Sequence, residues 1–307
     1  MTIEKEGFKL FAITSLRLSA ALIITSALAA LLALVAFSPA AQAHHSWGKY
    51  HWARTTTDGS FNLKLGDNVS SSTWDSSLSK ASTDWSVSTV LDTNIVTGGT
   101  SGATCNPTSG MVEVCNAEYG QNNWLGLAQI WISGKHITQG TTKMNDTYFA
   151  VPKYNTPAWR QFVMCQEVGH TFGLDHQDER FNNTNLETCM DYTNDPSGTL
   201  GTNGTLSNEQ PNQGDYDELL CVYDPASYRV MLSTTTHRCT GTGHIDSFTT
   251  VAPASAASTM PPAANRGSFN SRAQWGRLVE ESPNGKLELW VRDFGGEARM
   301  LTWVIRP

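Results

Sequence analysis

Residues 165–192 read CQEVGHTFGLDHQDERFNNTNLETCMDY, and this stretch decides the interpretation of the whole chain. Glu167 and His170 are three residues apart, so they share one face if the stretch is helical. Gly173 can turn the chain sharply, which would bring His176 back toward His170. Two imidazoles suit a zinc ion, because zinc accepts neutral imidazole nitrogen and lowers the pKa of a bound water to about 7. Glu167 beside that water would take its proton.

The flanking sequence predicts a mixture of helices and strands. Thr156 is a good N-cap and Pro157 suits the first helical position, so we expect a helix from 157 to about 172 that Gly173 ends. Apolar spacing favours a helix at 72–84, and 215–223 is typical of a terminal helix. Runs rich in β-branched and aromatic residues predict strands at 50–54, 61–65, 87–94, 111–117, 125–132 and 137–145. The polar residues 182–211 are expected to form loops.

The quoted stretch resembles the metzincin signature H-E-x-x-H-x-x-G-x-x-H followed by a Met-turn. The order of the expected elements is similar to that of the matrixin and serralysin branches, and the resemblance covers roughly residues 47–225. It implies an α+β fold with a mixed twisted sheet, an active-site helix and a Met-turn. It also implies a secreted zinc-dependent metalloendopeptidase, a hydrolase that cleaves peptide bonds through a metal-activated water.

The resemblance assigns a role to each matching position. Glu167 falls on the general base, His170 and His176 on the second and third zinc ligands, Gly173 on the turn glycine, and Met190 on the methionine of the Met-turn. Tyr192 matches a tyrosine that some branches use near the metal. The implied substrates are proteins or peptides, and we expect 125–132 to be the edge strand that pairs with an extended substrate.

Gln166 stands where the signature has its first histidine. A glutamine amide oxygen is a much weaker zinc donor than an imidazole nitrogen. Gln166 therefore ligates weakly, or another group replaces it, or the site is inactive. Asp175, Tyr192, His136 and His51 are the candidates for replacement. The alternative function is a catalytically inactive binding module that keeps the metzincin fold but holds metal weakly or not at all.

The charge balance argues against a nucleic-acid partner. The chain has 21 Lys and Arg against 28 Asp and Glu, for a net charge of -7, and its basic residues form no cluster that would neutralise phosphates. The Asp-, Asn- and Gly-rich residues around 194–215 are compatible with calcium, although they lack EF-hand spacing and a solvated loop is the simpler interpretation.

Residues 1–43 have the features of a secretory signal peptide. The uncharged run 18–37 follows Lys5, Lys9 and Arg17, and the A-x-A site at 41–43 follows it. The run is also long enough to span a bilayer, so a retained membrane anchor is the competing interpretation. Cleavage would give a secreted, extracellular and acidic protein with no membrane segment.

The cysteines fit such an oxidising compartment, because there are six of them and no C-x-x-C motif. Six cysteines allow 15 connectivities, and pairing neighbours gives the simplest set. That set is Cys105–Cys115, Cys165–Cys189 and Cys221–Cys239. The second bridge would hold the Met-turn beneath the active-site helix.

The composition changes toward the C-terminus. We expect a metallopeptidase domain at 44–245 and an Ala-, Pro-, Ser- and Thr-rich linker at 246–268. Residues 269–307 are expected to form a small β-module with strands at 276–279, 287–293 and 298–305. A module of this size is marginal alone, so we expect it to pack on the main domain.

We predict that export removes residues 1–43, with the cut between Ala43 and His44, because the A-x-A site directly follows the apolar run. The intact mass of the exported protein should match a chain that begins at His44. A mass that retains residues 1–43 would support the membrane anchor instead.

Overall fold

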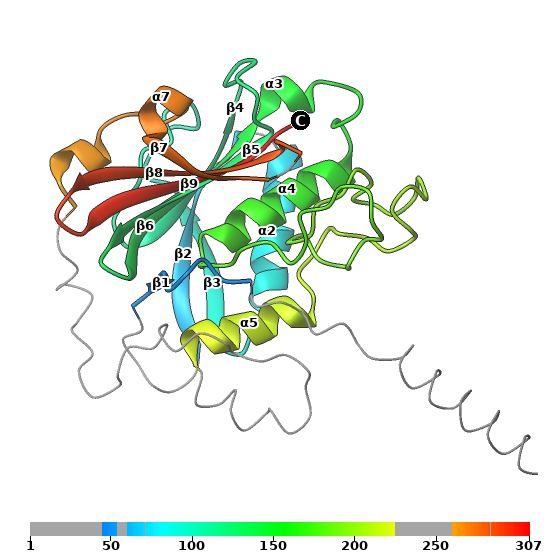
Figure 1. Cartoon of the computed structure of the whole chain (residues 1–307), viewed down its shortest axis with the longest axis horizontal. Coiled ribbons are helices and arrows are strands. Elements are labelled where there is room, and N and C mark those ends of the chain that lie inside the picture. Colours follow the sequence, from blue (N-terminus) through cyan, green and yellow to red (C-terminus); the bar gives the residue numbers. More distant parts are fainter. Residues whose placement is uncertain (1–44, 54–59, 71, 225–259, 283) are drawn as a thin grey trace, which may run out of the picture. The chain divides into compact units, whose positions relative to one another are not determined.

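Most of the β-branched and aromatic runs in the sequence form strands of one mixed sheet (Figure 1). The computed structural model describes residues 45–53, 60–70, 72–224, 260–282 and 284–307. The strands are β1 (His51–Trp52), β2 (Phe61–Asn68), β3 (Leu91–Thr97), β4 (Met111–Ala117), β5 (Gly126–Ser133), β6 (His136–Asn145), β7 (Arg277–Glu281), β8 (Leu287–Gly295) and β9 (Ala298–Ile305). The helices are α2 (Ser72–Trp85), α3 (Asp146–Phe149), α4 (Pro157–His170), α5 (Gln213–Tyr223), α7 (Arg272–Trp275) and the 3-10 helix η2 (Pro262–Asn265). The expected α+β class with a mixed sheet is confirmed.

The strand order is β3-β2-β4-β6-β5-β9-β8-β7, and β1 also pairs with β6. The neighbours β3, β2, β4 and β6 are parallel, whereas β5, β9, β8 and β7 follow one another antiparallel. The strand expected at 87–94 begins only at Leu91, because residues 86–90 form the turn that leaves α2. The short helices α3, η2 and α7 were not predicted, since four residues carry no readable helical period.

The expectation that 125–132 is an edge strand is wrong. β5 lies between β6 and β9, and the pairing with β9 runs from Gly126 opposite Ile305 to Ser133 opposite Ala298. The C-terminal strands thus continue the main sheet, and residues 42–307 form one compact unit. An extended peptide has no free backbone edge on β5 to pair with.

Both faces of the sheet are covered around β5 and β9. Helices α2 and α4 pack on one face, where Ile130, Leu301 and Trp303 belong to the larger apolar core. The residues of the same strands that point the other way contact the segment that contains η2 and α7, through a second core. That core consists of Trp124, Leu127, Trp131, Ala264, Phe269, Trp275, Met300 and Val304. The alternation explains why β5 and β9 are buried almost throughout.

The linker expected at 246–268 is structured at its end. Ala264 in η2 is fully buried, and Asn265 accepts a hydrogen bond from Gln139 of β6. Residues 246–259 lie outside the described residues, as do the signal peptide at 1–43 and Cys239. Among the helices of the described ranges, none is long and apolar enough to cross a membrane.

Lys143 of β6 is fully buried beneath the returning segment. Its ammonium donates to Gln129 Oε1 at 3.2 Å, to Asn270 Oδ1 at 2.8 Å and to the Ser268 carbonyl. All three acceptors are neutral, so no carboxylate offsets the loss of hydration, and burial lowers the pKa of Lys143 to about 7. Lys143 therefore ties residues 268–270 to the sheet while its charge is poorly solvated.

We predict that Lys143 makes stability depend on pH. The unfolded lysine keeps its proton up to a pKa of about 10.5 and the folded one up to about 7, so the free energy of unfolding should rise between these values, by at most about 1.4 kcal/mol per pH unit. Lys143→Met should flatten this rise in urea unfolding curves between pH 7 and about pH 9. The exposed Lys80→Met is the control, and identical pH profiles for wild type and Lys143→Met would contradict the prediction.

Candidate functional site

Helix α4 carries the residues that the signature singled out. It begins as predicted, with Pro157 in its first turn and the Thr156 side chain accepting a hydrogen bond from Trp159 N. Its last ten residues are all buried, because the helix packs against α2 and against strands β5 and β6. The helix ends at His170, and Gly173 turns the chain with a φ of +94° that side chains rarely adopt.

The loop between His170 and His176 is held by the first described residues of the chain. Trp47 N donates to the Gly173 carbonyl at 2.8 Å, and Asp175 N donates to the His45 carbonyl at 2.6 Å. His45 and His51 are each only 2% exposed. The segment that follows the predicted cleavage site thus fixes the loop that carries His176.

Glu167 is enclosed between α4 and β5. Its carboxylate lies against Gly126, where an added Cβ would stand only 2.3 Å from Oε1. Glu167 is 1% exposed, and within the described part of the chain neither carboxylate oxygen has a hydrogen-bond partner. Burial raises the pKa of Glu167 well above its usual range. An unpartnered carboxyl group in such a place is costly unless a cation or a water molecule uses it.

His170 and His176 face each other as the spacing predicts. Their ring centroids are 4.5 Å apart. His170 Nδ1 lies 2.9 Å from the Leu174 carbonyl, which leaves Nε2 as the atom with a free lone pair when Nδ1 carries the proton. Burial, with His176 close by, lowers the pKa of His170 to about 3, so its ring is neutral at physiological pH.

His176 is 8% exposed, and neither ring nitrogen has a hydrogen-bond partner. Its Nδ1 lies 3.4 Å from Asp175 Oδ1, without the geometry of a hydrogen bond. Two buried imidazoles and an unpartnered carboxyl group are a donor set that fits a zinc ion.

Met190 and Tyr192 lie on the other side of this site. The Met190 sulfur packs against Gly169, where an added Cβ would stand 2.8 Å away. Tyr192 stacks between His176 and Phe181, with centroid distances of 4.4 and 4.7 Å. Burial, with further contributions from Glu167 and Glu179, raises the pKa of Tyr192 well above its usual range. Tyr192 is therefore a neutral hydrogen-bond donor beside His176.

Gln166 is fully buried on the face of α4 that carries His170 one turn later. Its Nε2 donates to the Cys189 carbonyl at 2.8 Å, while its Oε1 has no hydrogen-bond partner. The amide thus links α4 to the turn that contains Met190. The Cys165–Cys189 disulfide joins the same two segments, with Cα atoms 5.9 Å apart.

The predicted disulfides Cys165–Cys189 and Cys105–Cys115 are both confirmed. The predicted pair Cys221–Cys239 includes Cys239, which lies outside the described residues.

The other candidate metal ligands form two separate groups. His51 and His136 contact each other on the paired strands β1 and β6, with ring centroids 5.2 Å apart. Asp175, His176 and Glu179 have ligand atoms within 4.8 Å of one another, and this is the only such group of three in the described part of the chain. Sequence reasoning missed Glu179, although its position three residues after His176 was a usable signal.

The loops at 194–215 hold the residues suggested for calcium. Asp195 accepts hydrogen bonds from Ser197 Oγ at 3.0 Å and from Leu200 N at 2.8 Å. The Asp195 carboxylate is therefore already hydrogen-bonded within its own loop. Calcium binding there stays a prediction.

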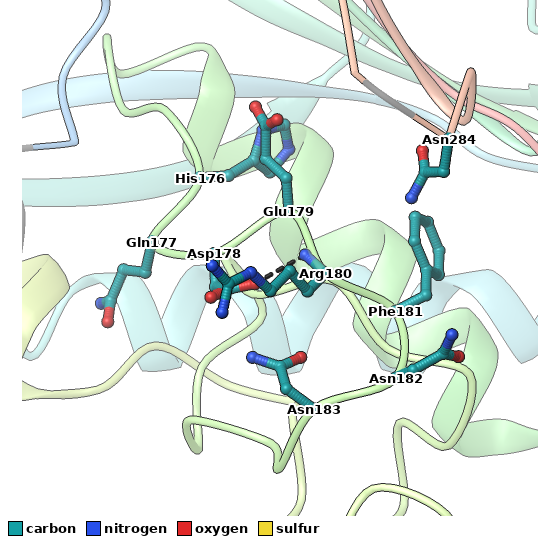
Figure 2. A pocket seen from close by; sticks show the side chains of 9 residues that line it. All are labelled: His176, Gln177, Asp178, Glu179, Arg180, Phe181, Asn182, Asn183 and Asn284. Carbon is teal, nitrogen blue, oxygen red and sulfur yellow. Dashed lines mark hydrogen bonds between the residues drawn. The ribbon is translucent and has the colours of Figure 1, made fainter.

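A cavity of about 800 Å³ opens beside His176 (Figure 2). Residues 176–183 line most of it, and Asn284 from the turn between β7 and β8 lines the rest. His176 and Glu179 reach it from the same loop, and Phe181 brings it next to Tyr192. The turn between the C-terminal strands β7 and β8 thus contributes to the wall of a hollow that touches the candidate site.

No protein-family model matches the chain, and no curated protein matches it. The function of the site therefore has to be argued from its own geometry.

We predict that the disulfide between α4 and the Met190 turn stabilises the site. Replacing Cys165 and Cys189 together by Ser opens a loop with a sequence separation of 24, which should lower the free energy of unfolding by about 3 kcal/mol. The same change at Cys105 and Cys115, with a separation of 10, is the control. Metal retention should fall only in the first variant, and equal retention in both would contradict a supporting role for Cys165–Cys189.

Proposed function

We propose that this protein is a secreted zinc-dependent endopeptidase of the metzincin type, with Glu167 as its general base. The observation that supports it best is the buried and unpartnered Glu167 carboxyl group one turn before His170, with His176 facing that histidine. Buried polar side chains without hydrogen-bond partners, here those of Glu167 and His176, seldom share one place without a ligand or a catalytic role. The signature residues, the two expected disulfides and the mixed sheet agree with this proposal.

A zinc ion held by His170 and His176 would supply a Lewis acid that polarises the scissile carbonyl and lowers the pKa of a bound water. Glu167 would accept a proton from that water at one of its carboxylate oxygens and later donate it to the amine that leaves. Its raised pKa makes it a stronger base than an exposed glutamate. Tyr192 keeps its proton, so it can donate a hydrogen bond to the oxygen of the attacked carbonyl.

The substrate would approach along the cavity beside His176 rather than along β5. Both edges of β5 are already paired, whereas the cavity reaches the candidate metal ligands directly. Its mixed lining, with Phe181, Arg180 and several amides, suits a side chain and the nearby backbone of a peptide.

A non-catalytic binding module is the second candidate. Two observations favour it. Strand β5 is paired with β6 and β9 and has no free edge for a substrate, and the Gln166 amide nitrogen donates a hydrogen bond to the Cys189 carbonyl. In that case the fold and its cavity would hold a peptide without cleaving it.

We predict that purified mature protein binds zinc and digests casein. Glu167→Gln should lower the turnover number by about 10²–10⁴-fold and leave the zinc content unchanged, because it removes the base but no ligand. Gln166→His should raise zinc retention, since an imidazole replaces an amide at the same helical position. Elemental analysis and a peptide-library digest of each variant measure both effects.

The control is Glu118→Gln, which changes an exposed glutamate on the surface. Wild-type protein that contains no zinc and cleaves nothing would contradict the enzyme and support the binding module.

A further inference from the structure

Two histidines alone do not complete a catalytic zinc site. Such sites usually have three protein ligands and one water, with bonds of about 2.0–2.2 Å. His170 and His176 supply two of these ligands in the proposed function. Gln166 is poorly suited to be the third, because its Nε2 is bound to the Cys189 carbonyl and an amide oxygen is a weak donor.

Two carboxylates lie close to His176. The ligand atoms of Asp175, His176 and Glu179 are within 4.8 Å of one another. Independently, His176 is more than nine-tenths buried, lacks a hydrogen-bond partner at both ring nitrogens, and lines the cavity that Glu179 also lines. Figure 2 shows the Glu179 carboxylate beside the His176 ring. A buried imidazole without hydrogen-bond partners, close to a carboxylate, favours the binding of a cation between them.

Glu179 is better placed for this role than Asp175. The Asp175 carboxylate accepts a hydrogen bond from His176 N at 2.8 Å, and its side chain is 38% exposed. The Glu179 carboxylate makes no hydrogen bond or ion pair with any described residue, although it is only partly exposed.

The charges around Glu179 also favour a cation. The Glu179 carboxylate lies close enough to the carboxylates of Asp175, Glu280 and Asp178 to interact with them, and His176 faces the same group. Glu280 comes from β7, so two distant parts of the chain bring negative charge to one place. A divalent cation would relieve this repulsion.

We propose that Glu179 supplies the third protein ligand of the zinc site, together with His170 and His176, in place of Gln166. This proposal rests on the proposed function. Glu179 would compensate for Gln166, the one position at which the chain departs from the signature. Ligand atoms of a tetrahedral zinc ion lie about 3.5 Å apart. The ligand atoms of His176 and Glu179 are within 4.8 Å of each other, so a movement of about 1 Å would bring this pair to that separation, with His170 on the other side of His176. Gln166 then has a positioning role, which is to hold the Met190 turn against α4.

The test is metal binding by the full mature chain, measured with Zn²⁺ by calorimetry and with Co²⁺ by visible absorption. Glu179→Gln should weaken Zn²⁺ binding by about 100-fold or more, because loss of a direct ligand exceeds the 10–100-fold effect of an outer partner. It should also change the Co²⁺ spectrum, which reports the ligand set. Glu179→His should restore binding, since imidazole is a good zinc donor. Gln166→Ala should keep the wild-type Co²⁺ spectrum.

Asp175→Asn and Glu118→Gln are the controls, one inside the cluster and one far from it in the sequence, and thermal melting reports whether each variant folds. If wild-type protein binds Zn²⁺ and Glu179→Gln binds it equally tightly, the inference is overturned and the proposed function stays intact. A Co²⁺ spectrum that changes in Gln166→Ala but not in Glu179→Gln would also overturn it. Wild-type protein that binds neither ion would overturn the proposed function itself.

Discussion

Helix α4 packs so closely on β5 that the Glu167 carboxylate fills the space where a side chain at position 126 would begin. The site depends on this contact, because it fixes the rotation of α4 about its own axis. With Glu167 directed at Gly126, His170 is placed one turn farther along, where the chain turns at Gly173 and returns with His176. A larger residue at position 126 would have to displace the helix or the carboxylate.

The same contact accounts for the electrostatics of the site. Burial between α4 and β5 strips Glu167 of water and of hydrogen-bond partners, and it keeps His170 neutral. Neutral imidazoles are what a metal requires, and a carboxyl group of raised pKa is what a proton transfer near neutral pH requires. The Cys165–Cys189 bridge and the Gln166 amide then hold the Met190 turn in place, so that Tyr192 packs on His176. In the proposed function, packing rather than surface charge would prepare the chemistry.

Local features of the sequence predicted much of this arrangement. The cap at Thr156, the turn at Gly173 and the facing histidines follow from residue chemistry within a short stretch, as does the Cys165–Cys189 pair. The position of β5 could not be predicted in this way. An apolar run looks the same in an interior and an edge strand, and only the distant partner β9, whose Ile305 accepts a hydrogen bond from Leu125 N, distinguishes them.

Lys143 and Glu179 show the same limit of a local pattern. A lysine in a strand is usually solvated, and its burial here depends on Ser268 and Asn270, which are far away in the sequence. Glu179 becomes a candidate ligand only because the fold brings it close to His176 and to Glu280 on β7.

In the proposed function, α4, the Gly173 turn and the following loop enclose a zinc ion. X-ray diffraction from crystals of the zinc-loaded mature protein, collected above and below the zinc absorption edge, locates such an ion directly. We expect an anomalous peak within bonding distance of His170 Nε2 and a ring nitrogen of His176, next to the Glu167 carboxylate. An anomalous map with no peak between these two imidazoles would contradict it.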